Sequence, residues 1–294
     1  MPGAVSDRGV VRTVRAMAVT AILFPGQGSQ TPGMRETVAQ VRPDLLELAI
    51  ETVGEDPFAR AEEGTNFAQP AIFCASLAGW TALGRPDGDL MAGHSLGELA
   101  ALVAAGSLDE YDALGLVALR GALMHQAGEL AGDGGMVALV GAGAAEHAGE
   151  LASAHGLSVA NDNSPQQVVL SGARTALPAA ATAAEQLGLR AMTLPVTGAF
   201  HSPMMASAIP EFQAALDRTK IEPPQVTVLS AVTAEPFADV RRQLVEALTM
   251  PVRWRETMLA LRALGAERFV EVGPGRVLTG LAKRTLRDVE LVNA

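Results

Sequence analysis

The sequence feature that most constrains the fold is a pentapeptide, Gly-His-Ser-Leu-Gly, at residues 93–97. A short apolar run at residues 90–92 precedes it, and a run with helix-forming composition follows it at residues 98–105. A Gly-x-Ser-x-Gly motif between a strand and a helix is typical of a nucleophile elbow, a sharp turn that lifts the serine hydroxyl clear of a sheet. The free N–H groups at the start of such a helix suit a developing oxyanion. We therefore expect Ser95 to be a nucleophile; the alternative is a chance match in a chain with 30 glycines.

Composition and charge narrow the class of protein. A chain of 294 residues with 49% hydrophobic residues can bury one large core and carry an insertion. Its net charge of −10 argues against nucleic acid as a partner. The chain has no uncharged apolar run long enough to cross a membrane, so we expect no membrane association. Its single cysteine, Cys74, rules out an internal disulfide and fits a reducing, cytoplasmic compartment.

The order of the expected elements predicts two structural units. Strands alternate with helices in the outer parts of the chain, which predicts a parallel sheet covered on both faces. Within residues 132–196 the expected order becomes β-α-β-β-α-β, that of a ferredoxin-like unit. We therefore predict an α/β fold with an α/β-hydrolase-like parallel-sheet core over residues 17–131 and 197–294 and a ferredoxin-like subdomain inserted at 132–196. Residues 1–16 are expected to form a flexible leader, with Met17 as an alternative start.

Local signals predict several element boundaries. A β-rich run predicts a strand over residues 19–24, and a proline suited to a first helical turn predicts a helix over residues 43–53. The Gln69-Pro70 dipeptide predicts that the next helix begins at Ala71. In the insertion, the polar stretch at residues 161–165 reads as the connection between two strands.

A serine hydroxyl needs a base to take its proton, and the chain has five histidines. His147 and His155 fall in a helix of the insertion and are expected at the surface. His125 lies near a helix end, and His94, beside the serine in sequence, is expected to point elsewhere. His201 lies in a loop after a strand and downstream of the serine, the chain order of α/β-hydrolases. Position alone makes it a candidate base and no more.

Position in the sequence does not determine which residue would orient His201. A carboxylate is the usual third member of a triad. Asp239 and Glu271 are candidates, although both follow the histidine and neither lies in a recognisable motif. A backbone carbonyl can hold an imidazole N–H equally well.

Arg120 lies beside apolar residues on a helix expected over residues 111–128. Its stem could lie on the surface with the guanidinium in water, which the residues alone favour. The other reading is a buried guanidinium that grips a carboxylate through two parallel hydrogen bonds.

Seven segments resemble, in order, motifs of the malonyl-CoA:acyl carrier protein transacylases and of the acyltransferase domains of polyketide synthases. The resemblance extends from about residue 20 to about residue 286. The segments are Phe-Pro-Gly-Gln-Gly-Ser-Gln at 24–30, Gly-His-Ser-Leu-Gly-Glu at 93–98, Arg-Gly at 120–121, Asn-Asp-Asn-Ser-Pro at 161–165 with Gln167, Phe-His-Ser at 200–202, Pro-Val-Arg-Trp at 251–254 and Glu-Val-Gly-Pro-Gly at 271–275.

The resemblance implies a role for each reacting group. Ser95 would be the acylated nucleophile. His201 would be its general base and then the acid for the leaving thiol, held by a main-chain carbonyl around Ala247. The backbone N–H groups of Gln27 and Leu96 would form the oxyanion hole.

The resemblance also implies the substrate. Arg120 would bind the free carboxylate of the malonyl group, and Asn163 would be a further substrate-binding residue. Phe200 matches the malonyl-type signature, in which a bulky residue fills the room that an α-methyl would need. One methyl is worth only about 1–3 kcal/mol of discrimination, so this predicts a preference for malonyl over methylmalonyl.

The reaction implied is a ping-pong transfer from malonyl-CoA to the phosphopantetheine thiol of an acyl carrier protein, for fatty-acid or polyketide synthesis. It releases coenzyme A and needs no metal or redox cofactor. The chain departs from the family at Ser230-Ala231, where Ser-Asn is common, and at Ala247, where Gln is common. An acidic carrier protein needs a local basic patch, and the candidates for it are Arg253, Arg255, Arg276, Lys283 and Arg284.

Three other functions remain compatible with the sequence. A serine esterase or thioesterase would use the same elbow and would have no use for Arg120. A non-catalytic carrier-protein binder could retain the fold. A malonyl transacylase of a malonate decarboxylase system would share the chemistry and serve another assembly.

Overall fold

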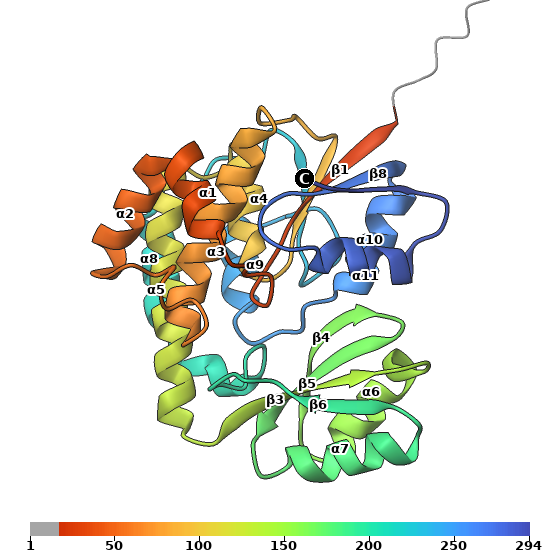
Figure 1. The fold of residues 1–294 in the computed structure, drawn as a ribbon. Coiled ribbons are helices and arrows are strands. Elements are labelled where there is room, and N and C mark those ends of the chain that lie inside the picture. Colours follow the sequence, from red (N-terminus) through yellow and green to blue (C-terminus); the bar gives the residue numbers. More distant parts are fainter. Residues whose placement is uncertain (1–17) are drawn as a thin grey trace, which may run out of the picture.

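The computed structural model describes residues 18–294, so the predicted leader and Met17 lie outside the described residues. The larger unit is built on one five-stranded sheet with the strand order β7-β2-β1-β8-β9 (Figure 1). Every neighbouring pair in it is parallel. The strands are β1 (Val19–Phe24), β2 (Leu90–Gly93), β7 (Thr227–Leu229), β8 (Ala266–Glu271) and β9 (Glu290–Asn293).

Both faces of this sheet are buried. Ile22 and Phe24 of the central strand β1 face one cluster of apolar side chains, whereas Ala21 and Leu23 face another, because successive side chains of a strand alternate. The doubly covered parallel sheet predicted from the sequence is therefore confirmed. Helices α1 (Met34–Val41), α2 (Pro43–Val53), α3 (Thr65–Ala82), α4 (Gly97–Ala104), α5 (Glu110–Ala131), α8 (Ile209–Arg218) and α9 (Val240–Glu246) contribute to the first cluster, and α10 (Trp254–Ala263) and α11 (Val277–Thr285) to the second.

The second sheet is antiparallel, with the strand order β4-β5-β3-β6 of a ferredoxin-like unit, as predicted. It lies below the parallel sheet in Figure 1, with α6 and α7 on its outer face. Its other face carries Met136, Ala138 and Val169 toward the main core. The elements are β3 (Gly134–Val140), α6 (Ala144–Ala154), β4 (Ser158–Ser164), β5 (Gln167–Ala173), α7 (Leu177–Gln186) and β6 (Arg190–Thr193).

Strand β4 connects the antiparallel sheet to the segment that precedes α10 in the larger unit. The N–H of Val252 donates to the carbonyl of Ala160 at 2.8 Å, and the N–H of Asp162 donates to the carbonyl of Val252 at 2.9 Å. Arg255 and Asp162 form an ion pair at 2.7 Å. The prediction that residues 161–165 form a connection is therefore wrong for residues 161–164. Irregularities in the register let this polar stretch keep its pairing with β5.

Helix α3 begins at Thr65 and continues through Pro70, so the predicted start at Ala71 is also wrong. Proline removes one helical hydrogen bond, which tertiary packing can offset. Here α3 packs closely on α5 at Gly121, where a Cβ atom would lie 2.9 Å from the carbonyl oxygen of Thr65. The added turn brings Thr65 and Gln69 to the same side of the helix.

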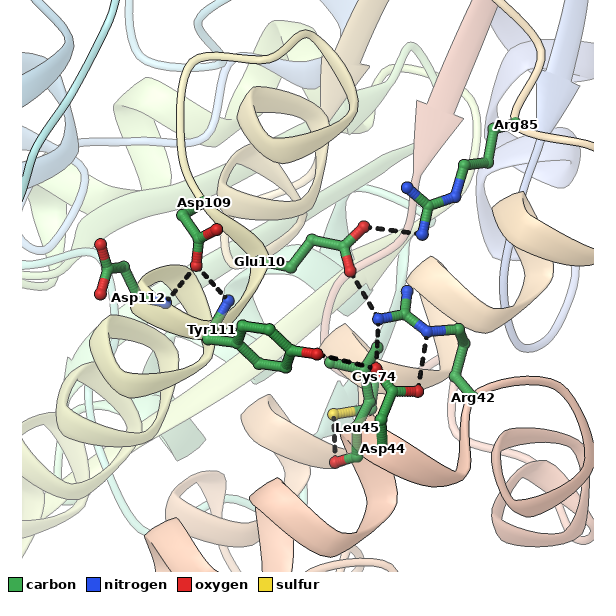
Figure 2. A network of polar contacts seen from close by, with 9 residues as sticks. All are labelled: Arg42, Asp44, Leu45, Cys74, Arg85, Asp109, Glu110, Tyr111 and Asp112. Atoms are coloured by element: carbon green, nitrogen blue, oxygen red, sulfur yellow. Dashed lines mark hydrogen bonds and ion pairs between the residues drawn. The ribbon is translucent and has the colours of Figure 1, made fainter.

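A polar network that is partly exposed to solvent fixes the start of α5 (Figure 2). Arg42 donates to both carboxylate oxygens of Asp44, at 2.9 and 2.7 Å, and to Glu110 at 2.5 Å. Asp109 caps the helix by accepting from the N–H groups of its first turn. The network thereby anchors the helix that carries Arg120. Within residues 18–294, no helix has both the length and the apolar composition to cross a membrane.

Candidate active site

The turn between β2 and α4 places Ser95 at the carboxyl edge of the parallel sheet. Ser95 has a left-handed backbone conformation with φ of 55°, which is uncommon for a residue with a side chain. A Cβ atom at Gly93 would lie 1.9 Å from the backbone of Gly97, and one at Gly97 would lie 2.2 Å from the carbonyl oxygen of Phe24. The two glycines are therefore required by the close approach of the backbone on either side of the serine.

His201 lies against the serine. Its Nε2 is 3.0 Å from Ser95 Oγ, and its Nδ1 is 2.9 Å from the carbonyl oxygen of Ala247, the residue that follows α9. Because a carbonyl can only accept, Nδ1 carries the proton and Nε2 presents its lone pair to the hydroxyl. Burial, and then the positive charge of Arg120, lower the pKa of His201 to about 3. The imidazole is therefore neutral at neutral pH.

The two carboxylates considered as orienting groups cap helices instead. Asp239 accepts from the N–H of Arg242 at the start of α9. Glu271 accepts from the N–H groups of Leu278 and Thr279 at the start of α11. Neither carboxylate holds the imidazole. The carbonyl of Ala247 does so, which is the alternative that the sequence left open.

Arg120 is 2% exposed, so the surface position that its neighbours alone favoured is wrong, and the guanidinium is buried as in the other reading. One guanidinium nitrogen donates to Ser95 Oγ at 3.1 Å and the other to Gln69 Oε1 at 2.7 Å. Gln69 in turn donates to the hydroxyl of Thr65 at 2.9 Å, which fixes the amide. Burial lowers the pKa of Arg120 to about 10, against the opposing effect of the negative charge of Glu98. The guanidinium remains a cation at neutral pH.

A cavity of about 260 Å³ lies between the parallel core and the antiparallel sheet. Gln27 and Leu96 line it, and the backbone N–H of neither residue donates to a hydrogen-bond acceptor within residues 18–294. They are therefore available to an oxyanion. All seven residues proposed for the site from the sequence line this cavity: Gln27, Ser95, Leu96, Arg120, Asn163, Phe200 and His201.

His94 and Gln69 are two polar residues of the cavity that sequence reasoning missed. His94 was expected to point elsewhere, yet it lines the cavity with Nε2 2.8 Å from Asn163 Oδ1 and its ring 5.3 Å from that of Trp254. Gln69 was read as a residue before a helix. Thr65 and Gln69 are four residues apart, a spacing that places both on one side of a helix. The predicted helix began only at Ala71, so this signal was not used. No sequence signal indicated the contact between His94 and a strand of the other sheet.

A serine on a nucleophile elbow, beside a neutral imidazole, defines the class as enzymes that transfer acyl groups through a serine. The model of the acyl transferase domain family matches residues 51–294. A malonyl CoA-acyl carrier protein transacylase of Haemophilus influenzae is 37% identical over 299 residues, 93% of this chain and 94% of that protein. The chain belongs to the malonyl CoA-acyl carrier protein transacylase family of acyl transferases.

Two further comparisons extend this result. An acyl carrier protein S-malonyltransferase of Vibrio cholerae has a crystal structure that superposes with a TM-score of 0.85 at 37% identity, covering 94% of this chain and 97% of that one. The polyketide biosynthesis protein ThaF of Burkholderia thailandensis is 40% identical over 285 residues. That alignment covers 92% of this chain and 24% of ThaF, so the chain spans about a quarter of that longer relative.

Proposed function

We propose that the chain moves a malonyl group from malonyl-CoA to the phosphopantetheine thiol of an acyl carrier protein through an acyl-enzyme on Ser95. One observation carries the proposal: a neutral imidazole and a buried guanidinium lie 3.0 and 3.1 Å from the same serine oxygen. The first can take the proton of the nucleophile, and the second can bind the free carboxylate of the acyl group. The names of the Haemophilus and Vibrio relatives support the same reaction.

In the first half-reaction, His201 Nε2 takes the proton of Ser95 as the oxygen attacks the thioester carbon. The negative charge that develops on the carbonyl oxygen lies near the N–H groups of Gln27 and Leu96. When the intermediate collapses, the carbon–sulfur bond breaks and His201 returns the proton to the sulfur of coenzyme A. The carbonyl of Ala247 keeps the imidazole oriented through both transfers.

In the second half-reaction, the carrier-protein thiol enters the place vacated by coenzyme A. His201 takes the thiol proton, the sulfur attacks the serine ester, and the serine oxygen leaves with the same proton. The first step converts a thioester into a serine ester, and the second converts that ester back into a thioester. The proposed chemistry therefore uses no metal or bound cofactor.

Selectivity for malonyl rests on Arg120 and Phe200. The guanidinium pairs with the acyl carboxylate, while Phe200, 6% exposed and bordering the cavity, occupies the room that an α-substituent needs. The contact with His94 fixes Asn163. We propose that Asn163 lines the space for the acyl and pantetheine groups on the side of β4.

For the carrier protein, we propose docking at α11, whose Leu278 and Leu281 line the cavity. Of the basic residues considered, Arg253 pairs with Glu256 and Arg255 pairs with Asp162. The remaining three are exposed and form no ion pair within residues 18–294: Arg276, Lys283 and Arg284. A carrier protein of fatty-acid or polyketide synthesis, acidic as a class, is the expected partner.

The test is the mass of the intact protein after mixing with malonyl-CoA, followed by addition of phosphopantetheinylated carrier protein. A malonyl adduct that Ser95→Ala lacks, and that moves to the carrier protein, is the expected result. An adduct lost to water at the same rate with and without carrier protein would indicate a thioesterase. A wild-type protein that forms no adduct would contradict the proposal and favour a non-catalytic binder.

A further inference from the structure

The mechanism leaves two buried carboxylates unused, Glu271, which caps α11, and Glu98. Glu98 lies in the first turn of α4, immediately behind the nucleophile elbow, and is 1% exposed. Its Oε1 accepts from the N–H of Ala231 at 2.8 Å. That bond connects α4 to the loop after β7, at the position where this chain departs from the common Ser-Asn of its family. A carboxylate so far from water needs a compensating charge or must take up a proton.

The compensating charge available to Glu98 is Arg120. Neither residue forms an ion pair of 4.0 Å or less with any partner in residues 18–294, and the charge of each opposes the effect of burial on the pKa of the other. Burial raises the pKa of Glu98 to about 7, while the N–H of Ala231, the charge of Arg120 and the side chain of Ser230 oppose this rise. The carboxylate is therefore close to its midpoint at neutral pH.

The malonyl carboxylate disturbs this balance. On the proposed function, it pairs with Arg120 and adds a second negative charge to a buried site that holds one cation. The guanidinium can no longer stabilise the ionised form of Glu98 to the same extent. Besides Arg120, the titratable groups that line the cavity are two imidazoles, His201 and His94, whose pKa values are both lowered by burial.

We propose that Glu98 is the counter-charge of Arg120 in the empty site, and that it takes up one proton from solvent when the malonyl carboxylate binds Arg120. The inference rests on the proposed function, because it needs the acyl carboxylate at Arg120. It assigns to Glu98 a charge-balancing role, without contact with the reacting atoms.

The proton taken up by Glu98 can be measured, because acyl transfer itself neither consumes nor releases a proton. The serine O–H and the thioester become an ester and a thiol, and the thiol stays protonated near pH 7. Any proton removed from the buffer is therefore bound by the protein. Acetyl-CoA provides the matched control, since it releases the same thiol and delivers no carboxylate.

The experiment mixes the enzyme with malonyl-CoA or acetyl-CoA in weak buffer with a pH indicator, and normalises the signal to the loaded fraction measured by intact mass. We expect an uptake of up to one proton per malonyl-loaded enzyme just above pH 7, and none per acetyl-loaded enzyme. Malonyl loading without proton uptake would overturn the inference and leave the proposed function intact. Absence of malonyl loading, or loading that Arg120→Ala does not weaken, would refute the proposed function itself.

Two variants assign the proton. Glu98→Gln keeps an oxygen for the N–H of Ala231 and removes the charge, so we expect it to abolish the uptake. Glu271→Gln is the matched control, a buried glutamate that also accepts from backbone N–H groups and is expected to retain the uptake. If proton uptake persists in Glu98→Gln, the proton binds to an imidazole instead, and the assignment to Glu98 is refuted. If that variant does not fold, the comparison of malonyl with acetyl in the wild type still decides whether loading takes up a proton.

The pH profile separates charge balance from a structural role. Because binding takes up a proton, kcat/KM for malonyl-CoA should fall as the pH rises above about 7 in the wild type. In Glu98→Gln it should stay level, so the ratio of variant to wild type rises with pH. A residue that merely supports the fold would lower kcat/KM by the same factor at every pH.

Discussion

The parallel core and the antiparallel sheet contribute to the cavity in different ways. The core supplies the groups proposed to react, and its backbone fixes them: Ser95 and His201 are two of the five non-glycine residues with positive φ in residues 18–294. The antiparallel sheet supplies a wall, through Asn163 and the apolar side chains beside it. Strand β4 attaches that wall by two backbone hydrogen bonds to Val252. The difference teaches that the groups proposed to react lie where the backbone is most constrained, whereas the lining groups lie on a separate sheet that packs against the core.

The strongest test of this division is His201→Ala. Removal of the general base should lower the rate of malonyl transfer by roughly 10⁴- to 10⁶-fold. Steady-state kinetics with a carrier protein measures the loss. His155→Ala, at the end of helix α6 in the antiparallel unit, is the control and should retain the wild-type rate. Comparable losses of rate in both variants would contradict the division between a reacting core and a lining sheet.

Arg120→Ala should give the next largest effect. Truncation of one partner of a buried charge pair costs about 2–5 kcal/mol, or roughly 30-fold to several thousandfold in kcat/KM for malonyl-CoA. Acetyl-CoA has no carboxylate, so its kcat/KM should change much less. An equal loss for the two substrates would show that Arg120 supports the site without binding the acyl carboxylate.

Glycine substitutions compare the two units by stability. Gly93→Ala forces a Cβ atom to within 1.9 Å of backbone in the elbow, and should lower the free energy of unfolding by about 3 kcal/mol or more. Gly149→Ala, within helix α6, meets no atom within 4 Å and should raise it by about 0.5–1 kcal/mol. Urea unfolding measures both, and a tolerated Gly93→Ala would contradict the close approach described here.

Asn163→Ala tests the contribution of the wall. It leaves the Nε2–H of His94 without its partner, at a cost of about 1–3 kcal/mol, so kcat/KM should fall roughly ten- to a hundredfold for malonyl-CoA and acetyl-CoA alike. Asp162→Asn, on the same strand, weakens a partly exposed ion pair and should cost about 0–1 kcal/mol. If Asn163→Ala matched His201→Ala, the wall would belong to the reacting machinery.

The smallest expected effect is that of acid on the base. The pKa of His201 is lowered to about 3, so the imidazole stays neutral and loading with acetyl-CoA should change less than twofold between about pH 7 and pH 5. The free energy of unfolding should nevertheless decline as the pH falls below 6.5, the ordinary pKa of histidine. Below that pH the unfolded chain binds a proton that the folded chain excludes. A rate that halves near pH 6.5 while the fold persists would show that His201 titrates normally.

Local sequence predicted the elements whose signals are local. The bounds of β1 and α2 follow from a β-rich run and a proline at the first helical position, and the structure has both as predicted. The polar end of β4 could not be foreseen, because besides β5 it pairs with Val252, far along the chain. Helix α1 was not predicted at all, since its eight residues carry a weak local signal.

The same distinction applies to the site. Each of the seven cavity residues named from the sequence lies in a segment whose motif resembles the family. His94, Gln69 and Glu98 were assigned no role, because their roles depend on Asn163, Arg120 and Ala231, which lie on other elements. Contacts between distant segments are tertiary information that periodicity and turn chemistry do not carry.

The left-handed backbone at Ser95 and His201 bears on attempts to engineer the enzyme. Each such conformation costs of order 1–3 kcal/mol for a residue with a side chain, and glycine would relieve it. A library selected for heat resistance alone would therefore accumulate glycine at the two positions on which catalysis is proposed to depend. Directed evolution of this protein needs a screen for turnover in every round.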